Sequence, residues 1–331
     1  MAKKPTALAR ELRKTPIKKM FECEALADRE TGRFKKWFKE NYGYEHSKAR
    51  EAELATALFS YCAKRKDRGR DTLRTRVKGD GFEITPLTTE LKAKSTSFID
   101  DSFTTMTLRD ILKTREGQCV AFTSLYCMLA EELGMKNIKP FEVTHNPDGT
   151  PLAGGHVVAA LMRRNMAPVL FDPANYKPNV KYKGRPQEKE YLLVAALSNK
   201  GVELKRHEEA LLNYDIALKI KPDYVEALIC KGHALSGLGL HKEAIRQYDK
   251  ALKVMPKNPI KLGVVLGDKG LALSHLGRYE EAIRSYDKAL AAIDKNHPAL
   301  FANTLELKLR ALALAGGLDA AKATKRGRPQ A

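Results

Sequence analysis

The 331-residue sequence contains no apolar run of about 18 residues or more, so we expect no helix that spans a membrane. The first twenty residues are basic but lack the apolar core and the cleavage site of a secretory signal. The five cysteines are scattered, odd in number and without a CxxC pair, which argues against a disulfide framework or a structural zinc site. We therefore expect a cytoplasmic protein with reduced thiols, no cofactor and no metal.

Acidic residues are comparatively few, with 40 Asp and Glu against 59 Lys and Arg. The net charge is +9 in residues 1–100, +2 in residues 101–190 and +8 in residues 191–331, so the excess lies in the flanks. The basic run at 63–78, AKRKDRGRDTLRTRVK, could bind nucleic acid or another polyanion. Because no nucleic-acid motif accompanies this charge, a solvated surface is the interpretation that we favour.

Internal repetition is the strongest pattern in the last third of the chain. The phrases YDIALKIKP at 214–222, YDKALKVMP at 248–256 and YDKALAAID at 286–294 are spaced 34 and 38 residues apart. Pro222 and Pro256 can each stop a helix at the end of a phrase. This period and these positions resemble tetratricopeptide repeats, which are stacked pairs of antiparallel helices.

The resemblance implies tight packing between the paired helices of each repeat. Tyr248 and Tyr286 would fill the space between neighbouring pairs. The first repeat is three residues shorter than the second and the third is four longer, which we interpret as altered turns between helices. The small residues expected at close contacts are Gly232, Ala244 and Ala251 in the second repeat and Gly270, Ala282 and Ala289 in the third.

A closing helix at 298–316 is expected to follow the repeats, and residues 317–331 form a basic tail. Repeat arrays of this kind bind extended segments of protein partners on their concave face. A protein or peptide is therefore the partner that we expect for this part of the chain.

A cysteine lies at an unusual place in the middle segment. Residues 112–135, LKTREGQCVAFTSLYCMLAEELGM, predict a helix that begins just after Gly117 and ends at Gly134. Cys119 falls in the first turn, where unpaired backbone N–H groups and the helix dipole favour a thiolate. Cys127 lies in mid-helix among apolar residues and is interpreted as a core residue.

Three strands are expected after this helix, at 136–146, 154–164 and 167–175, and the last two form an antiparallel hairpin. If the hairpin turn centres on Arg164, the register places His156 directly opposite Asp172. A two-residue shift would leave them diagonal neighbours, and a one-residue shift would place them on opposite faces of the sheet. An imidazole between a helix-terminal thiol and a carboxylate is the arrangement of a catalytic triad.

The three sequence blocks are TLRDILKTREGQCVAFTSLYCMLAEELGM, GGHVVAAL and VLFDPANY. They resemble the transglutaminase-like branch of the papain-like thiol enzymes. The resemblance implies that Cys119 is the nucleophile, His156 the general base and acid, and Asp172 the group that orients the imidazole. It covers about 70 residues of the chain. The same three side chains are also metal-ligand types, which leaves a divalent metal site as an alternative.

The sequence therefore predicts an α+β transglutaminase-like domain, with a helix and an antiparallel sheet, followed by an all-α tetratricopeptide solenoid. The expected divisions are a helical basic extension at 1–100, the thiol domain at 101–190, the repeats with their closing helix at 191–316 and a basic tail at 317–331. The first functional hypothesis is a thiol hydrolase that cleaves a peptide, isopeptide or other amide bond by acyl transfer. The alternatives are a catalytically inactive repeat scaffold and a binder of polyanions.

Overall fold

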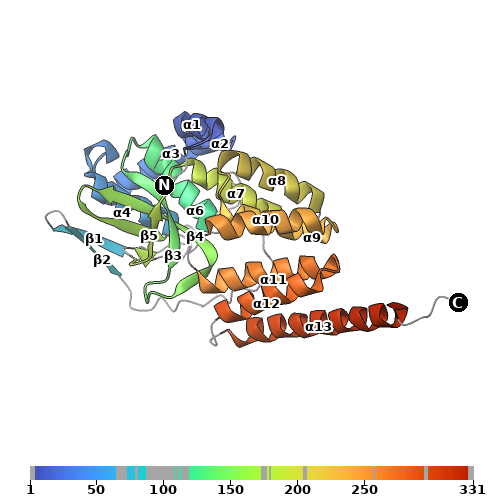
Figure 1. The fold of residues 1–331 in the computed structure, drawn as a ribbon. Helices are drawn as coiled ribbons and strands as arrows, with labels where there is room; N and C mark the ends of the chain where they lie inside the picture. Colours follow the sequence, from blue (N-terminus) through green and yellow to red (C-terminus); the bar gives the residue numbers. More distant parts are fainter. Residues whose placement is uncertain are drawn as a thin grey trace. The chain divides into compact units, whose positions relative to one another are not determined.

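The computed structural model divides the chain into two compact units, one of residues 1–203 with 219–221 and one of residues 204–218 with 222–331 (Figure 1). Within the described residues, no helix is long and apolar enough to cross a membrane. The structure describes residues 4–64, 73–78, 81–86, 108, 112, 119–172, 177–178, 180–203, 207–255, 258–293 and 297–326.

The first unit contains a five-stranded antiparallel sheet in the order β6-β5-β4-β3-β7. The three expected strands are present, and the turn between β4 and β5 contains Asn165, with a φ of 56°. The two edge strands were not predicted, because they are short and their sequences show no apolar alternation. The strands are β3 (Ile138–His145), β4 (Pro151–Arg163), β5 (Met166–Asp172), β6 (Lys177–Pro178) and β7 (Lys183–Pro186).

Helix α6 (Cys119–Glu132) packs against this sheet, as Figure 1 shows. The hydroxyl of Thr123 donates a hydrogen bond of 3.0 Å to the carbonyl oxygen of Val157 in β4. The ring of Tyr126 stacks on Phe171 of β5, with 5.6 Å between their centroids. These contacts join one face of α6 to β4 and β5, the two strands of the expected hairpin.

The N-terminal helices belong to the same unit as α6. The backbone N–H of Ile17 donates to Glu131 of α6 at 2.7 Å, and the hydroxyl of Tyr126 donates to the carbonyl oxygen of Ala55 at 2.6 Å. These helices therefore form part of the core around α6. They are α1 (Ala7–Lys14), α2 (Ile17–Met20), α3 (Glu24–Tyr42) and α4 (Glu51–Lys64), with a short 3-10 helix, η1 (His46–Lys48).

The expectation that residues 1–100 are helical is wrong in part, because they also contain a β-hairpin. Strand β1 (Leu73–Lys78) pairs antiparallel with β2 (Gly81–Pro86). The hairpin was missed because the basic composition of residues 63–78 hides the alternation that marks a strand. Half of that basic run, residues 65–72, lies outside the described residues.

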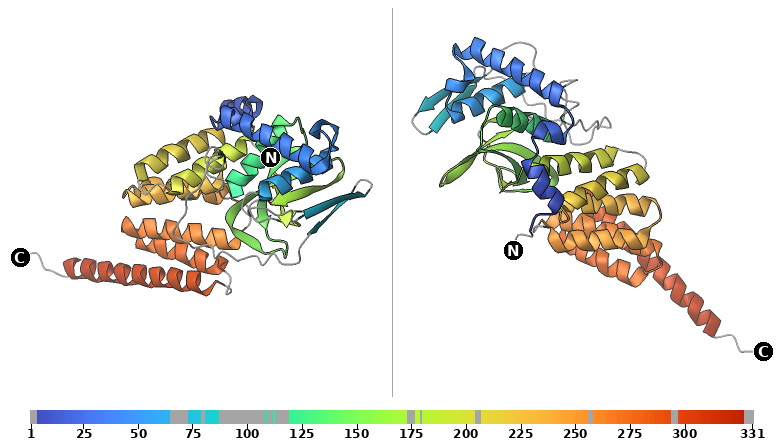
Figure 2. Two further views of the ribbon diagram at one scale, coloured as in Figure 1. Left: turned by 180° about the vertical axis from the view of Figure 1, so that it is seen from behind. Right: turned by 90° about the horizontal axis from the view of Figure 1, so that it is seen from above.

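The last part of the chain is a helical solenoid, preceded in sequence by α7 (Glu190–Glu203), the first helix of the first repeat. In Figure 2 its helices lie side by side, with the C-terminal helix in red at the end of the array. The helices of the solenoid are α8 (His207–Ile220), α9 (Val225–Gly237), α10 (His241–Val254), α11 (Pro259–His275), α12 (Tyr279–Ala292) and α13 (Pro298–Arg326).

Our interpretation of the length differences as altered turns is wrong. Three residues separate the paired helices in each repeat, so the differences lie in helix length. Helix α7 ends two residues after Gly201, whereas α9 ends five residues after Gly232. Helix α11 gains its four residues as an extra N-terminal turn, because Asn258 caps Lys261 N–H at 2.9 Å and Pro259 suits the first helical position.

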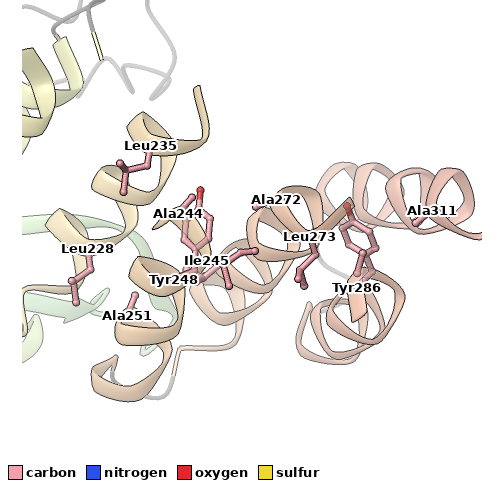
Figure 3. Packing of buried hydrophobic residues seen from close by; sticks show 12 residues of the cluster. Leu228, Leu235, Ala244, Ile245, Tyr248, Ala251, Ala272, Leu273, Tyr286 and Ala311 are labelled. Carbon is pink, nitrogen blue, oxygen red and sulfur yellow. The ribbon is translucent and has the colours of Figure 1, made fainter. Parts of the chain in front are cut away.

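The tyrosines of the repeated phrase pack inside the repeats. Tyr248 of α10 lies against Gly232 of α9, and Tyr286 of α12 lies against Gly270 of α11, so each ring contacts the glycine of its own helix pair. Both tyrosines belong to one buried cluster that runs from α9 to α13 (Figure 3). We expected these rings to fill the space between neighbouring helix pairs. They also fill the space between the two helices of their own pair.

Gly270→Ala is expected to destabilise the solenoid, because a Cβ at this position would lie 2.6 Å from a ring carbon of the fully buried Tyr286. The ring cannot move away without disturbing the close-packed core, so we expect a loss of about 1–3 kcal/mol in the free energy of unfolding. Urea denaturation of the full chain measures this loss.

The matched control is Gly267→Ala, one turn earlier in the same helix, where nothing lies within 4 Å of the added Cβ. Because alanine is the better helix former, this variant is expected to gain up to about 1 kcal/mol. Equal effects of the two substitutions would contradict the packing account.

Candidate thiol active site

His156 and Asp172 are in direct contact across the sheet. The Nε2 atom of His156 lies 2.8 Å from Oδ2 of Asp172. The Asp172 side chain is fully buried, whereas 14% of the His156 side chain is exposed. A buried carboxylate bonded to one ring nitrogen fixes the tautomer and the orientation of the imidazole.

The register that produces this contact differs from the predicted one by two residues. Ala159 pairs with Phe171 and Ala160 with Leu170. Continuing this register places Asp172 opposite Val158, so His156 is its diagonal neighbour on the same face of the sheet. One residue of the shift comes from the turn, because Arg163 pairs with Met166. The second comes from the irregularity between this pair and the pair of Leu161 with Val169, which a count centred on Arg164 cannot anticipate.

Cys119 is the first residue of α6, and it is partly exposed. Its thiol shares a side-chain hydrogen bond with His156. Because Asp172 occupies Nε2 of the ring, Nδ1 is the nitrogen that remains for the cysteine. The hydrogen bond from Thr123 to Val157 holds the next turn of α6 beside His156. The three predicted residues therefore meet, in the order Cys119, His156, Asp172.

The surroundings of His156 favour its charged form. Burial disfavours the imidazolium, but the hydrogen bonds to Asp172 and Cys119, together with their charges, outweigh it and raise the pKa of His156 to about 10. The ring therefore holds a proton at neutral pH, between two groups that can each carry negative charge. This is the charge state expected of an imidazole that serves as counter-ion to a thiolate.

Tyr182, which precedes β7, is a member of the site that sequence reasoning missed. Its hydroxyl donates to Oδ2 of Asp172 at 3.0 Å, and its ring meets that of His156 edge to face, with 5.6 Å between centroids. The tyrosine therefore supplies a second donor to the buried carboxylate. The short strands around Tyr182 have no periodic sequence pattern, so its position beside Asp172 could not be predicted from the sequence.

The other cysteines lack this environment. Burial raises the pKa of Cys127 well above its ordinary value, with a further contribution from the charge of Glu131. Burial also raises the pKa of Cys230 to about 11, assisted by the charge of Glu226. Cys23 and Cys62 are buried. Both thiols with raised pKa values are disfavoured as nucleophiles at neutral pH.

The three side chains do not have the arrangement of a metal site. Among the described residues, no group of three or more His, Cys, Asp or Glu side chains is placed to hold a metal ion.

Comparison with known proteins identifies the repeats. The family model described as "Tetratricopeptide repeat" matches residues 225–258 and 265–296. The C-terminal part therefore contains tetratricopeptide repeats, a class of module that binds protein partners. A search of curated proteins gave no match.

The solved structures that are similar to part of the chain include the following two. The first is the crystal structure of the Sgt2 TPR domain from Aspergillus fumigatus, which is 21% identical and covers 42% of this chain and 85% of that chain, with a TM-score of 0.30. The second is a MamA RS-1 ArsTM double mutant, which is 20% identical and covers 38% of this chain and 78% of that chain, with a TM-score of 0.28.

Proposed function

We propose that this protein is a thiol enzyme of the transglutaminase-like type, which transfers the acyl group of an amide through Cys119. One observation carries the proposal: His156 is bonded to Asp172 on one side and to Cys119 on the other, at the N-terminus of a helix. The sequence blocks around the three residues support the same reading. The substrate class is a peptide, isopeptide or other amide bond.

The first step forms a thioester. The Sγ of Cys119, as thiolate, attacks the amide carbonyl carbon, and a tetrahedral intermediate forms. His156 then gives its ring proton to the leaving nitrogen, the C–N bond breaks, and the amine departs. Asp172 keeps the ring aligned through its bond to Nε2 and stabilises the imidazolium.

The second step releases the acyl group. Water or an amine attacks the thioester, the neutral His156 accepts its proton, and the C–S bond breaks to restore the thiolate. The backbone N–H of Cys119 lies at the start of α6, where no helical carbonyl is available to it. It can therefore donate to the oxyanion of both tetrahedral intermediates.

The tetratricopeptide repeats supply the recognition that a small thiol site lacks. Such modules hold a segment of a partner protein, so in this proposal they bring a protein substrate to the enzyme. The alternative hypothesis is a repeat scaffold without catalytic activity. Normal binding of partners together with no amide cleavage would support that alternative.

Selective alkylation of Cys119 tests the proposal directly. Intact protein is treated with iodoacetamide at neutral pH, and the modified cysteines are mapped by peptide mass spectrometry over time. Cys119 is expected to react first, because Cys127 and Cys230 both have raised pKa values. His156→Ala should slow the reaction at Cys119 and leave the rate at Cys230 unchanged. Equal rates at all three cysteines would count against a thiol enzyme.

A further inference from the structure

Tyr182 lies in the segment that connects the two edges of the five-stranded sheet. Strand β6 pairs with β5 at one edge and β7 pairs with β3 at the other, so the chain between β6 and β7 has to cross the sheet. Near the start of this crossing, the backbone N–H of Val180 donates to the carbonyl oxygen of Leu170 in β5 at 3.4 Å. Tyr182, two residues later, is the last residue before β7. The crossing therefore brings a tyrosine to the strands that carry His156 and Asp172.

Packing holds the Tyr182 ring on the face of the sheet that contains the site. The ring packs against a buried apolar cluster formed by β3, β4 and β5. Val158 of this cluster is two residues from His156 in β4, and two residues along a strand is the spacing of one face. Leu170 is likewise two residues from Asp172 in β5. The ring is therefore supported by the same face that presents the imidazole and the carboxylate.

Two donors share one oxygen atom of Asp172. Nε2 of His156 lies 2.8 Å from Oδ2, and the Tyr182 hydroxyl donates to the same atom at 3.0 Å. Because the Asp172 side chain is fully buried, hydrogen bonds take the place of water around its negative charge. The strength with which the carboxylate holds the imidazole therefore depends on what else this oxygen accepts.

The hydroxyl of Tyr182 is expected to make His156 a weaker base. While the imidazole is protonated, its positive charge compensates the carboxylate. When the imidazole is neutral, the carboxylate charge is uncompensated, and a hydroxyl donor stabilises it more in this state. Burial lowers the pKa of His156, whereas the hydrogen bonds and charges of Asp172 and Cys119 raise it to about 10. The hydroxyl therefore opposes the contribution of Asp172.

The proposed reaction needs an imidazole that both gives and accepts a proton. In the first step the protonated ring gives its proton to the leaving nitrogen, and in the second step the neutral ring takes one from water or an amine. A ring held too firmly as imidazolium releases its proton slowly in the first step and is not available as a base in the second. The best pKa for such a group lies near the pH at which it works.

We propose that Tyr182 is a positioning residue of the thiol site, which shares Oδ2 of Asp172 with His156 so that the imidazole can release its proton and take it back in one catalytic cycle. The inference rests on the proposed function and assigns a task to Tyr182 within it. Tyr182 acts through the carboxylate and transfers no proton itself.

The pKa of His156 in Tyr182→Phe tests the proposal, because phenylalanine keeps the ring and removes only the hydroxyl. The measurement is made by NMR in the Cys119→Ala background, which lacks the thiolate and so resembles the acyl-enzyme in the charge around the imidazole. There the pKa of His156 should lie below about 10 while Tyr182 is present, since the contributions of Cys119 are absent. Tyr182→Phe should raise this pKa by roughly half a pH unit or more.

The direction of the change separates this role from a structural one. If the hydroxyl only held the carboxylate in place, its loss would loosen the bond between Asp172 and His156 and lower the pKa of His156. A tyrosine that only filled space would leave the pKa unchanged, because the ring is retained. A pKa that falls or stays constant in Tyr182→Phe would therefore overturn the proposal.

Two controls show whether the hydroxyl acts through Asp172. In Asp172→Asn the carboxylate charge is absent, so adding Tyr182→Phe should produce no further change in the pKa of His156. Tyr61→Phe removes another buried hydroxyl-to-carboxylate bond of the same unit, the 2.7 Å bond from Tyr61 to Glu30, and should leave the pKa of His156 unchanged. An equal rise in either control would contradict the assigned route. Circular dichroism verifies that each variant is folded.

The decay of the acyl-enzyme measures the consequence for the reaction. With Cys119 present, the acyl-enzyme formed from a fluorogenic peptide amide is followed by mass spectrometry as a function of pH. In Tyr182→Phe the midpoint of the pH dependence of its hydrolysis should move upward, and hydrolysis near neutral pH should slow about threefold. A wild type that forms no acyl-enzyme would refute the thiol enzyme itself, whereas an acyl-enzyme that decays alike in both proteins would refute only the role of Tyr182.

Discussion

Cys119→Ala is expected to abolish amide cleavage, with a loss of at least about a thousandfold in turnover. Without the thiol no thioester can form, and His156 keeps its bond to Asp172 but has no nucleophile to activate. The measurement uses fluorogenic peptide and isopeptide amides, together with mass spectrometry of the trapped acyl-enzyme. Because Cys119 is partly exposed, the smaller alanine should leave the fold intact.

Cys230→Ala is the matched control, since this cysteine is also partly exposed and lies in the repeat array. It should cleave the amides at the rate of the wild type and form the same acyl-enzyme. The proposal fails if Cys119→Ala retains the cleavage measured in the wild type. A chain that never forms an acyl-enzyme, yet captures a partner equally well with and without Cys119, would instead support the scaffold hypothesis.

Asp172→Asn is expected to reduce turnover by up to about 10⁴-fold, because the amide can no longer stabilise the imidazolium or enforce its tautomer. The same substitution replaces the carboxylate, whose hydrogen bond and negative charge raise the pKa of His156, by a neutral amide. The pKa of His156, followed by NMR as a function of pH, should therefore fall below the wild-type value of about 10.

The raised pKa of His156 also makes the free energy of unfolding depend on pH. The folded pKa of His156 is above the ordinary value of about 6.5, so its contribution to stability is complete below that pH. The contribution is lost as the pH rises from about 6.5 to about 10. Urea denaturation should show this loss in the wild type and a smaller one in Asp172→Asn.

The control for both measurements is Asp268→Asn. Asp268 pairs with His233 at 2.7 Å in the repeats, but 49% of the His233 side chain is exposed. Because an exposed pair is screened by water, this substitution should change stability by less than about 1 kcal/mol. It should leave turnover unchanged. Similar pH profiles for the two variants would contradict a special role for the buried pair.

The contact between His156 and Asp172 could be predicted from the sequence, because side chains alternate between the two faces of a strand. An error of two residues in the register therefore leaves both side chains on the predicted face. His156 and Asp172 were expected to be directly opposite, but the turn and the irregularity after Leu161 together shift the pairing by two residues. An even shift keeps both side chains on one face, so their contact survives. Tyr182 could not be found in the same way, because its segment has no period from which a neighbour can be calculated.

The repeats were predictable for a different reason. Each copy of the phrase repeats both the packing residues and the charges, so the pattern could be read without tertiary information. The pattern could not show whether the extra or missing residues of a repeat belong to a helix or to a turn, because the two can have the same amino-acid composition. The cap formed by Asn258 and Pro259 was the available signal for the longer α11, and it was overlooked.

The contacts around α6 also bear on how the protein is made. The bonds from Ile17 to Glu131 and from Tyr126 to Ala55 join residues 114 and 71 positions apart. Contacts between such distant residues require the closure of long loops, and the entropy of that closure slows folding. Cys119 leaves the ribosome before His156 and Asp172, so during synthesis its thiol has neither activating partner. In the proposed enzyme, reactivity at Cys119 therefore requires the chain through β5 to be complete and assembled, which would protect the nascent polypeptide from a premature nucleophile.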